Sequence, residues 1–455
     1  MPADSAAPES NKNIMEELYA KYLACGCKVT TDSRAIRGGE IFFALRGENF
    51  DGNNYALKAL EAGAAWAVVN EDSPIKSAND EKGTGESRLI RVADPLTTLR
   101  DLAIWHRMHV RDGKLPVIGL TGTNGKTTTK NLISAVLAKK YRVTATQGNL
   151  NNDIGVPLSV LSITPETEIA VIEMGASHPD DIAKLVPISR PDYGLITNVG
   201  RAHLLGFGSF EGVKAAKGEL YNWLGSHRGS LIFLNEDDAD LREMAAKQPC
   251  HTFGYGVEYQ HAEILPATPE EPFLRIRLGE DLVKTNLVGA YNATNVLAAL
   301  AVGEYFGVPR ADAIAAIAEF VPANNRSQMV RTSANTLIVD AYNANPSSMH
   351  AALDNFRHVE AAHKLALLGD MRELGEESVA EHEKVVRQLR ENGIPACLVG
   401  EEFQKALAKL PAGDEQWFPS ADALLEHIQG HPVQDTVILI KGSHSISMEK
   451  VVPVL

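Results

Sequence analysis

The stretch TGTNGKTT, at Thr121–Thr128, is the part of the sequence from which the rest is interpreted. It follows LPVIGL (115–120), a short apolar run rich in branched residues that is typical of a buried parallel strand. It precedes KNLISAVLAKK (130–140), which has apolar residues at helical spacing and lysines in its last turn. The pattern predicts a strand, a glycine-rich loop and a helix in succession.

A loop of this composition is suited to binding phosphate. Gly122 and Gly125 permit a tight turn whose N–H groups point inward, and the positive end of the following helix attracts anions. Lys126 can reach the β- and γ-phosphates of a nucleotide, and the Thr127 hydroxyl can bind Mg²⁺. Leu120 stands where the full motif has its first glycine, so we interpret the stretch as a variant phosphate-binding loop. The alternative is a glycine-rich turn with a chance lysine; the agreement of strand, glycines, Lys-Thr pair and helix disfavours it.

Composition narrows the class of protein. A chain of 455 residues, 44% apolar and 22% charged, predicts an ordinary globular protein of two to four domains. The net charge of 44 − 58 = −14 argues against nucleic-acid or membrane-surface binding. No apolar run approaches the roughly 20 residues that span a bilayer, and residues 1–13 lack a secretory core and suggest a loose tail. The four cysteines show no metal-binding pattern and are expected to be reduced thiols in a cytoplasmic protein: Cys25, Cys27, Cys250 and Cys397.

Residues 1–113 are predicted to form a small α/β domain. IFFAL (41–45) and AWAVV (65–69) are typical of strands, with a helix between them at 54–64. The intervening RGENFDGNN (46–54) suits either a plain turn or a loop that binds a polar ligand. A polar loop is expected at 71–88. A helix is expected from residue 94 to Gly113, and Pro116 marks the boundary that follows.

Residues 114–328 form the predicted central domain, and two strand ends in it carry candidate ligands. In open parallel sheets ligands bind at the carboxyl ends of strands. Glu173 ends the strand EIAVIE and could bind the Mg²⁺ held by Thr127; the alternative is a surface glutamate. His203 follows the strand YGLIT and is a candidate metal ligand; alone, it would more often be a buried hydrogen-bonded histidine.

Further candidates in this domain are ambiguous on the residues alone. Lys217 lies in a predicted helix, and reaction of its amine with CO₂ would turn it into an anion able to bridge metal ions, although an ordinary solvated lysine is the simpler interpretation. Asn292 and Asn295 begin the helix YNATNVLAALAVGEYFG, where Asn292 could cap the helix or the asparagine amides could bind a base edge. β-structure is expected near 250–290. Arg326, in the linker VPANNRSQ, could reach a phosphate or be an exposed linker residue.

Residues 329–455 again alternate strands with helices and predict a Rossmann-like open α/β sheet without a phosphate loop of its own. Polar residues follow the ends of its strands and are expected to gather at one edge of the sheet. These residues are Asp340, Tyr342, Asn343, Asn345, Asp370, Lys441, Ser443 and His444. That edge is expected to bind a second substrate or to close over the nucleotide.

Taken in order, these motifs resemble the Mur ligases of peptidoglycan synthesis. The motifs are TGTNGKTTT, IEMGAS, NVGRAHL, AAKGEL, the asparagine-led helix, Arg326 and DAYNANPSSM. Within the family GNLNNDIGVPLS (148–159), DAYNANPSSM, LLGDMRELG and VILIKGSHSISMEKVV are similar to the MurF type. The resemblance implies a central P-loop-type parallel sheet with helices on both faces, a small N-terminal domain for the UDP-muropeptide and a C-terminal domain that closes over ATP.

The resemblance also implies residue roles. The ATP phosphates would contact Gly122, Thr123, Asn124, Gly125, Lys126, Thr127 and Thr128, with Asn295, Arg326 and Asp340 at the nucleotide. Magnesium would be held by Thr127, Glu173, His203 and a carbamylated Lys217, and the catalytic residues would be Lys126, His203 and Lys217. The muropeptide and amine substrates would contact Ser33, Arg34, Arg46, Gly47, Asn149, Asn151, Asn152, Asn343 and Asn345.

The implied activity is ATP-dependent amide-bond formation through an acyl phosphate. The substrates would be UDP-N-acetylmuramoyl-tripeptide and D-alanyl-D-alanine, with ATP and Mg²⁺ as cofactors. We expect a cytoplasmic monomer without nucleic-acid or membrane partners. The alternatives are another ligase of the same fold, of the MurE or folylpolyglutamate synthase type, and a P-loop kinase or non-catalytic nucleotide-binding protein.

Overall fold

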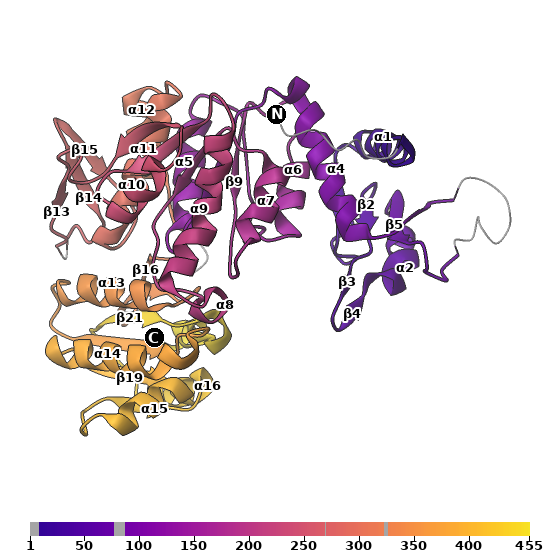
Figure 1. Cartoon of the computed structure of the whole chain (residues 1–455). Coiled ribbons are helices and arrows are strands. Elements are labelled where there is room, and N and C mark those ends of the chain that lie inside the picture. The colour runs from indigo at the N-terminus through magenta and orange to yellow at the C-terminus, as the bar shows by residue number, and fades with distance from the viewer. Residues whose placement is uncertain (1–8, 77–86, 269, 323–325) are drawn as a thin grey trace. The chain divides into compact units, whose positions relative to one another are not determined.

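The computed structural model describes residues 9–76, 87–268, 270–322 and 326–455. Contacts between Cα atoms separate the chain into two compact units that interleave along the sequence. The first comprises Met1–Gly119, Tyr141–Gly175 and Asp181–Tyr193, and the second comprises Leu120–Lys140, Ala176–Asp180 and Gly194–Leu455. Mainly parallel sheets alternate with helices in both (Figure 1), which confirms the predicted α/β class.

The first unit contains a four-stranded parallel sheet in the order β1–β2–β5–β6. Its strands are β1 (Val29–Thr30), β2 (Ile41–Phe43), β5 (Trp66–Asn70) and β6 (Leu89–Val92). The expected polar loop after β2 is a short hairpin of β3 (Arg46–Gly47) and β4 (Phe50–Asp51). A 3₁₀ turn at Gly52–Tyr55 and helix α2 (Ala56–Glu61) then lead to β5. Strand, helix and strand therefore follow one another as predicted.

Three helices of the first unit pack against α4 (Pro95–His109). They are α1 (Glu9–Ala24), α6 (Gly155–Leu161) and α7 (Asp181–Ser189). Asp94 caps α4 because its carboxylate accepts hydrogen bonds from the N–H groups of Leu96 and Thr97.

Hydrogen bonds of buried polar groups connect these helices to distant parts of the first unit. The Tyr22 hydroxyl donates to the Leu161 carbonyl at 2.7 Å, and His106 Nε2 donates to that of Ile163 at 2.9 Å. The buried Arg107 guanidinium donates to the Ser189 carbonyl and pairs with Asp192 at 3.0 Å. Each of these donors is satisfied by a residue far along the chain.

A six-stranded sheet has the strand order β12–β11–β10–β7–β9–β8. The strands are β7 (Val117–Thr121), β8 (Val143–Ala145), β9 (Ile169–Glu173), β10 (Tyr193–Ile196), β11 (Leu231–Asn235) and β12 (His251–Tyr255). Every residue of β7, β9 and β11 is buried, as expected for a parallel sheet covered by helices on both faces.

The second unit adds helices to this sheet and a small sheet beside it. The helices are α5 (Lys126–Ala138), α8 (Leu204–Phe207), α9 (Phe210–Ser226), α10 (Ala239–Ala246), α11 (Ala293–Tyr305) and α12 (Arg310–Glu319). The β-structure expected near 250–290 includes an antiparallel sheet of β13 (Glu263–Leu265), β14 (Arg275–Leu278) and β15 (Asp281–Lys284).

The C-terminal part, orange to yellow in Figure 1, is a six-stranded sheet in the order β16–β17–β21–β18–β19–β20. The strands are β16 (Gln328–Arg331), β17 (Thr336–Asp340), β18 (Lys364–Gly369), β19 (Ala396–Val399), β20 (Gln416–Phe418) and β21 (Val437–Lys441). All pairs are parallel except the edge pair β16–β17. The helices are α13 (Pro346–Arg357), α14 (Ser378–Glu391), α15 (Glu401–Lys409) and α16 (Ala421–Gly430).

Alternation along β17 explains why both faces of this sheet are covered. Ile338 joins a core that includes Leu353 of α13 and Val385 of α14. Leu337 and Val339 point to the opposite face, into a core that includes α16. Successive side chains of a strand leave on opposite faces, so an uninterrupted apolar strand requires helices on both sides.

Two expectations about helix ends are wrong. Residues 9–13 belong to α1 rather than to a loose tail, because extending a formed helix adds one hydrogen bond per residue. Helix α4 ends at His109 rather than near Gly113, since Arg111 and Asp112 have φ of 49° and 54°, outside the helical region. Parts of the predicted loop at 71–88 and linker at 321–328 lie outside the described residues, as do residues 1–8 of the predicted tail.

Two further observations concern the described chain as a whole. None of its helices combines the length and apolarity that crossing a bilayer requires. All four cysteines carry free thiols, and burial raises the pKa of the Cys397 thiol to about 11.

Candidate active site

The loop between β7 and α5 has the geometry of a phosphate-binding loop. Gly122 and Gly125 have φ of 144° and 79°. A Cβ atom on Gly122 would collide with the Thr197 hydroxyl, and one on Gly125 would lie 2.7 Å from Oδ1 of Asn295. Both positions therefore require glycine for space as well as for backbone conformation.

Lys126 begins α5 and folds back over this loop. Its ammonium donates to the carbonyls of Gly122 at 2.7 Å and Thr123 at 3.1 Å. Thr127, the next residue, is buried in the first turn of the helix. The first N–H groups of a helix lack intrahelical partners and carry partial positive charge, so a cation and these donors face the same loop.

Asn198, which follows the end of β10, anchors the phosphate loop through hydrogen bonds. Its side chain accepts a hydrogen bond from the Asn124 N–H and donates to the Asn124 carbonyl, both at 3.0 Å. The Thr197 hydroxyl donates to the same carbonyl at 2.6 Å, and the Gly200 N–H donates to the Thr123 hydroxyl at 3.0 Å. Sequence analysis missed Asn198; its place directly after a buried strand was the available signal.

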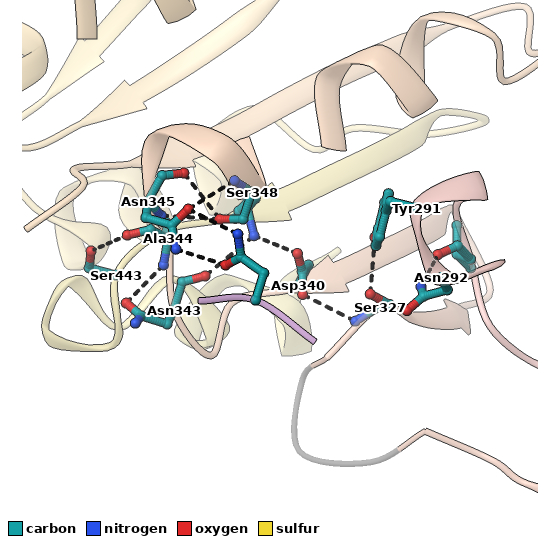
Figure 2. Close-up of polar contacts among 12 residues, drawn as sticks. Tyr291, Asn292, Ser327, Asp340, Asn343, Ala344, Asn345, Ser348 and Ser443 are labelled. Atoms are coloured by element: carbon teal, nitrogen blue, oxygen red, sulfur yellow. Dashed lines mark hydrogen bonds and ion pairs between the residues drawn. The ribbon is translucent and has the colours of Figure 1, made fainter. Parts of the chain in front are cut away.

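The start of α13 lies against the phosphate loop. The Asn345 carbonyl oxygen Oδ1 accepts from the Ser348 N–H at 2.9 Å and caps the helix, as Figure 2 shows. The amide nitrogen of Asn345 donates to Oδ1 of Asn124 in the loop at 2.8 Å. The Arg201 N–H donates to the Ser347 hydroxyl at 3.2 Å. Asn343 is exposed, and its Oδ1 accepts from the Ala344 N–H.

The predicted gathering of polar residues at the edge of the C-terminal sheet is confirmed. Asp340 and Lys441 end neighbouring strands in register, and the Lys441 ammonium donates to Oδ2 of Asp340 at 2.5 Å. The other Asp340 oxygen accepts from the Ser327 N–H, and the Ser327 hydroxyl contacts that of Tyr291 at 3.0 Å (Figure 2). This chain of contacts connects the sheet edge to the residues just before α11.

Arg326 is held by aromatic stacking. Its guanidinium lies 3.6 Å from the centroid of the Tyr342 ring. Tyr342 also neighbours the ring of His444, with a centroid distance of 5.9 Å and an interplanar angle of 27°. Arg326 therefore contacts a residue that follows a strand end and is not a free linker arginine.

Asp370 lies at this edge as expected, but its carboxylate turns inward. It is fully buried and accepts hydrogen bonds from the N–H groups of Glu402 and Phe403 at 3.0 Å, so it caps α15. Burial raises the pKa of Asp370, whereas the neighbouring His382 has a pKa lowered by burial. The residue stabilises the sheet edge and does not face a ligand.

The asparagines that lead α11 form hydrogen bonds with neighbouring parts of the protein. Asn292 occupies the N-cap position, but its side chain donates to the Val288 carbonyl at 2.8 Å and makes no cap bond, so the predicted cap is wrong. Asn295 donates to Oδ1 of Asn292 and accepts from the Thr129 hydroxyl, both at 2.9 Å. Asn295 therefore lies beside Gly125 and braces α11 against the helix of the phosphate loop.

His203 lies within electrostatic reach of both Lys126 and Lys217. His203 has a left-handed backbone, with φ of 52°, and its Nδ1 contacts a carboxylate oxygen of Glu373. Burial, and the charges of Lys126 and Lys217, lower the pKa of His203, while Glu373 opposes that shift. Lys217 is buried in α9, with its ammonium 5.4 Å from the Phe207 ring centroid.

Of the four predicted metal ligands, Glu173 and His203 carry a carboxylate and an imidazole, whereas Thr127 and Lys217 carry neither. In the described parts of the chain, no three His, Cys, Asp or Glu side chains converge as a metal site. Glu173, buried at the end of β9, accepts a hydrogen bond from the Asn151 amide at 2.9 Å. Glu173 belongs to the first unit, and Thr127, His203 and Lys217 belong to the second.

The predicted muropeptide residues all belong to the first unit. They are Ser33, Arg34, Arg46, Gly47, Asn149, Asn151 and Asn152. Arg34 pairs with Asp32 at 2.9 Å, and Arg46 pairs with Asp72 at 2.9 Å. Asn152 Oδ1 accepts from the Gly155 N–H at 2.8 Å at the start of α6. The two arginines are thus neutralised in part by neighbouring carboxylates.

Family profiles match three successive segments of the chain. They are the Mur ligase family catalytic domain at residues 28–107, the Mur ligase middle domain at 120–303, and the Mur ligase glutamate ligase domain at 325–444. The chain belongs to the Mur ligase family. This confirms the resemblance in sequence, and the three-domain α/β architecture with it.

Relatives of this Mur ligase share its length. The UDP-N-acetylmuramoyl-tripeptide–D-alanyl-D-alanine ligase of Bacillus subtilis is 33% identical over 433 residues, which cover 93% of this chain and 92% of that protein. The Escherichia coli ligase of the same name is 33% identical, with 94% and 93% covered.

Among solved structures, MurF from Acinetobacter baumannii superposes with a TM-score of 0.80 at 29% identity, covering 94% of this chain and 92% of that chain. MurF from Thermotoga maritima, in complex with ADP, superposes with a TM-score of 0.78 at 26% identity, covering 94% and 96%. Both of these solved structures are of the MurF type.

Proposed function

We propose that this Mur ligase joins D-alanyl-D-alanine to UDP-N-acetylmuramoyl-tripeptide, with conversion of ATP to ADP and phosphate, in peptidoglycan precursor synthesis. The observation that carries the proposal is a phosphate loop in a chain that matches ligases of that name over more than nine-tenths of its length. The MurE-type and folylpolyglutamate synthase structures share the fold, at 18% and 15% identity. No observation favours their substrates.

The chemistry explains why a phosphate loop serves an amide-forming enzyme. A carboxylate resists attack by an amine because oxide is a very poor leaving group. In the proposed reaction the tripeptide carboxylate attacks the γ-phosphorus, the bond to the β–γ bridging oxygen breaks, and ADP leaves with that electron pair. The amine of D-alanyl-D-alanine then attacks the acyl carbon and loses a proton, and phosphate departs from that carbon.

Residues of the phosphate loop would lower the first barrier. Backbone N–H groups within Gly122–Thr128 and the Lys126 ammonium are proposed to hold the β- and γ-phosphates. Phosphoryl transfer depends mainly on in-line positioning and on neutralising charge, which these donors supply. Asn295, Arg326 and Asp340 are proposed to contact the nucleoside or phosphates, and the contact between Asn345 and Asn124 brings α13 to the same loop.

Magnesium fits this site as a companion of the nucleotide. Mg²⁺ keeps several waters and is usually bound by one or two protein oxygens together with substrate phosphates, so a loop without a three-ligand protein cluster is compatible with it. Thr127 and Glu173 are proposed to hold one ion, and His203 with Lys217 a second. The ion, when bound, supplies charge neutralisation for the transferring phosphoryl group.

Carbamylation is the form of Lys217 that we propose at such a site. A buried ammonium would repel a cation, whereas a carbamate presents oxygen ligands. Burial of Lys217 beside Phe207 would also limit the access of water to the modified side chain.

The three segments are proposed to divide the substrates among them. Residues 1–113 would bind the uridine nucleotide, through the region of Ser33, Arg34, Arg46 and Gly47. Residues 114–328 would bind ATP, with Asn149, Asn151 and Asn152 facing the muropeptide. Residues 329–455 would close over ATP and bind the amine near Asn343. The need for ATP and UDP-activated substrate supports a cytoplasmic location, and we propose a monomer.

Substrate-dependent ADP production tests this function. Release of ADP should require ATP, the UDP-muropeptide and D-alanyl-D-alanine together, and the product should contain a new amide bond by mass spectrometry. ADP release that is unaffected when D-alanyl-D-alanine is omitted, or replaced by N-acetyl-D-alanyl-D-alanine, whose amine is blocked, would contradict the proposal and favour a kinase. Comparing tripeptides with lysine or diaminopimelate at the third position would define the stem that the enzyme accepts.

A further inference from the structure

Glu373 lies in the stretch LLGDMRELG (367–375), three residues after the buried Asp370. It follows β18 in the C-terminal part of the second unit, and its carboxylate contacts Nδ1 of His203, a residue 170 positions earlier. The contact joins two backbones in the same unusual state, since Glu373 has φ of 64° and His203 has φ of 52°. Left-handed residues other than glycine cost energy and persist where surrounding contacts hold them.

Neighbouring contacts hold the two turns together. The Leu205 N–H donates to the Glu373 carbonyl at 3.3 Å. Arg201 pairs with Glu377 at 2.9 Å, and its N–H donates to the Ser347 hydroxyl. These contacts join the two turns through residues other than His203, whereas the Glu373 carboxylate contacts the His203 ring itself.

The nitrogen that Glu373 contacts determines the use of the other one. A neutral imidazole carries one N–H and one lone pair, and a carboxylate at Nδ1 requires the N–H there. Nε2 then keeps its lone pair and acts as the acceptor or ligand nitrogen.

We propose that Glu373 is a positioning residue for His203, which fixes the ring with Nε2 available to a cation at the phosphate site. The inference rests on the proposed function. It also means that the C-terminal segment supplies part of the phosphoryl-transfer site through a carboxylate as well as through Asn345. The Glu373 side chain is 59% exposed, so its effect is expected through geometry more than through charge, which solvent screens.

Three variants distinguish the positioning of the His203 ring by Glu373 from the other contacts between the two turns. Glu373→Ala removes the contact, Glu373→Gln restores an oxygen acceptor for the Nδ1 N–H without charge, and Glu377→Gln removes the Arg201 ion pair while leaving His203 alone. Partners of this kind typically contribute about 10–100-fold to activity. We expect kcat to fall about 10–100-fold in Glu373→Ala, while KM for the carboxylate and amine substrates stays within about twofold. Most of the lost kcat should return in Glu373→Gln. In Glu377→Gln, and in Glu376→Gln at an exposed neighbouring position, kcat should change little.

A spectroscopic measurement keeps the proposal testable apart from catalysis. The protein has 14 histidines, so in ¹⁵N-histidine-labelled protein the His203 ring signals are assigned by their loss in His203→Gln. These signals should show the Nδ1–H tautomer in the wild type. They should shift toward the Nε2–H tautomer in Glu373→Ala. An unchanged tautomer, or a loss of activity in Glu377→Gln equal to that in Glu373→Ala, would overturn the inference. If the wild type shows this tautomer but forms no amide, the proposed function fails and the positioning contact stands.

Discussion

At the residue scale, Lys126 hydrogen-bonds to its own loop and is proposed to bind the transferring phosphate. Substitution of Lys126 tests whether the second role contributes to turnover. Its ammonium donates to the carbonyls of Gly122 and Thr123, and we propose that it also binds the γ-phosphate. We expect Lys126→Ala to lower the rate of ADP release by about 10²–10³, because electrostatic contacts aimed at a transition state have this magnitude. Steady-state turnover with saturating substrates measures the effect.

Lys139, at the other end of the same helix, provides the control. Its ammonium forms an exposed ion pair with Glu319 at 2.7 Å, and exposed pairs contribute about 0–1 kcal/mol. Lys139→Ala should therefore leave turnover almost unchanged. A Lys126→Ala enzyme as active as the Lys139→Ala enzyme would show that the loop does not bind the transferring phosphate.

Lys217 offers a test of the proposed carbamate. Arginine keeps the positive charge but cannot form a carbamate, so Lys217→Arg should lose about 10²-fold in activity, the order of loss expected for a disrupted metal environment. Lys214, one turn earlier on α9 and paired with Asp240 at 2.7 Å, is the matched control, and Lys214→Arg should stay active. Wild-type activity should fall reversibly at low pH, where carbamates decompose, and return with bicarbonate. Full activity of Lys217→Arg would end the carbamate hypothesis.

At the element scale, α13 depends on Asn345 for both its start and its contact with the phosphate loop. Asn345→Asp keeps the oxygen that caps the helix but has no N–H for Asn124, whereas Asn345→Ala loses both. We expect Asn345→Ala to lose about 1 kcal/mol of stability and Asn345→Asp little. Both should weaken kcat/KM for ATP about fivefold, the range of one neutral hydrogen bond.

Urea unfolding and ATP-dependent kinetics distinguish the two roles. Asn222→Asp makes the same chemical change at an exposed position on α9, where the oxygen that accepts from Gln248 is kept, and should alter neither measurement. Normal kinetics in both Asn345 variants would mean that the contact between α13 and the loop has no part in turnover.

Helix α4 carries a pH-dependent anchor in His106. The ring donates to the Ile163 carbonyl, and burial lowers its pKa to about 4, whereas in the unfolded chain it is about 6.5. A lowered folded-state pKa means that the unfolded chain binds the proton more readily, so this stability is complete above pH 6.5 and is lost as the pH falls toward 4. Between pH 7 and 5 the loss should be about 2 kcal/mol.

The urea midpoint at the two pH values measures this loss. His106→Gln should reduce the pH dependence, and the exposed neighbour His109→Gln should retain it. An identical pH dependence in the two variants would show that His106 is not the responsible group.

The elements also show how far sequence reasoning reaches. Strand–helix alternation, the phosphate loop and the polar sheet edge were predictable, because apolar periodicity and strand ends are local signals. The contact of His203 with Glu373 was not, since nothing local relates residues 170 positions apart. Asp370 was placed at the correct edge, but its inward turn to cap α15 depends on the tertiary position of that helix.

At the scale of the whole molecule, the predicted boundary at residue 113 meets contacts that cross it. Tyr22, His106 and Arg107 lie before it, and the carbonyls of Leu161, Ile163 and Ser189 that satisfy them lie after it. Removing the partners of buried polar groups costs about 1–3 kcal/mol for each group. A fragment of residues 1–113 should therefore be digested rapidly in α4, whereas the full chain should be protected there; equal protection would show that the fragment folds alone.

The interleaving of the first unit has a consequence for biosynthesis. Its last segment ends at Tyr193, which the ribosome reaches 193 − 113 = 80 residues after residue 113. At elongation rates of about 5–20 residues per second this takes about 4–16 s. During that interval the nascent helix α4 has been made but its partner carbonyls have not, so it is a substrate for chaperones and proteases. Slow translation between codons 114 and 193 would lengthen this exposure and lower the yield of the enzyme without any change in its sequence.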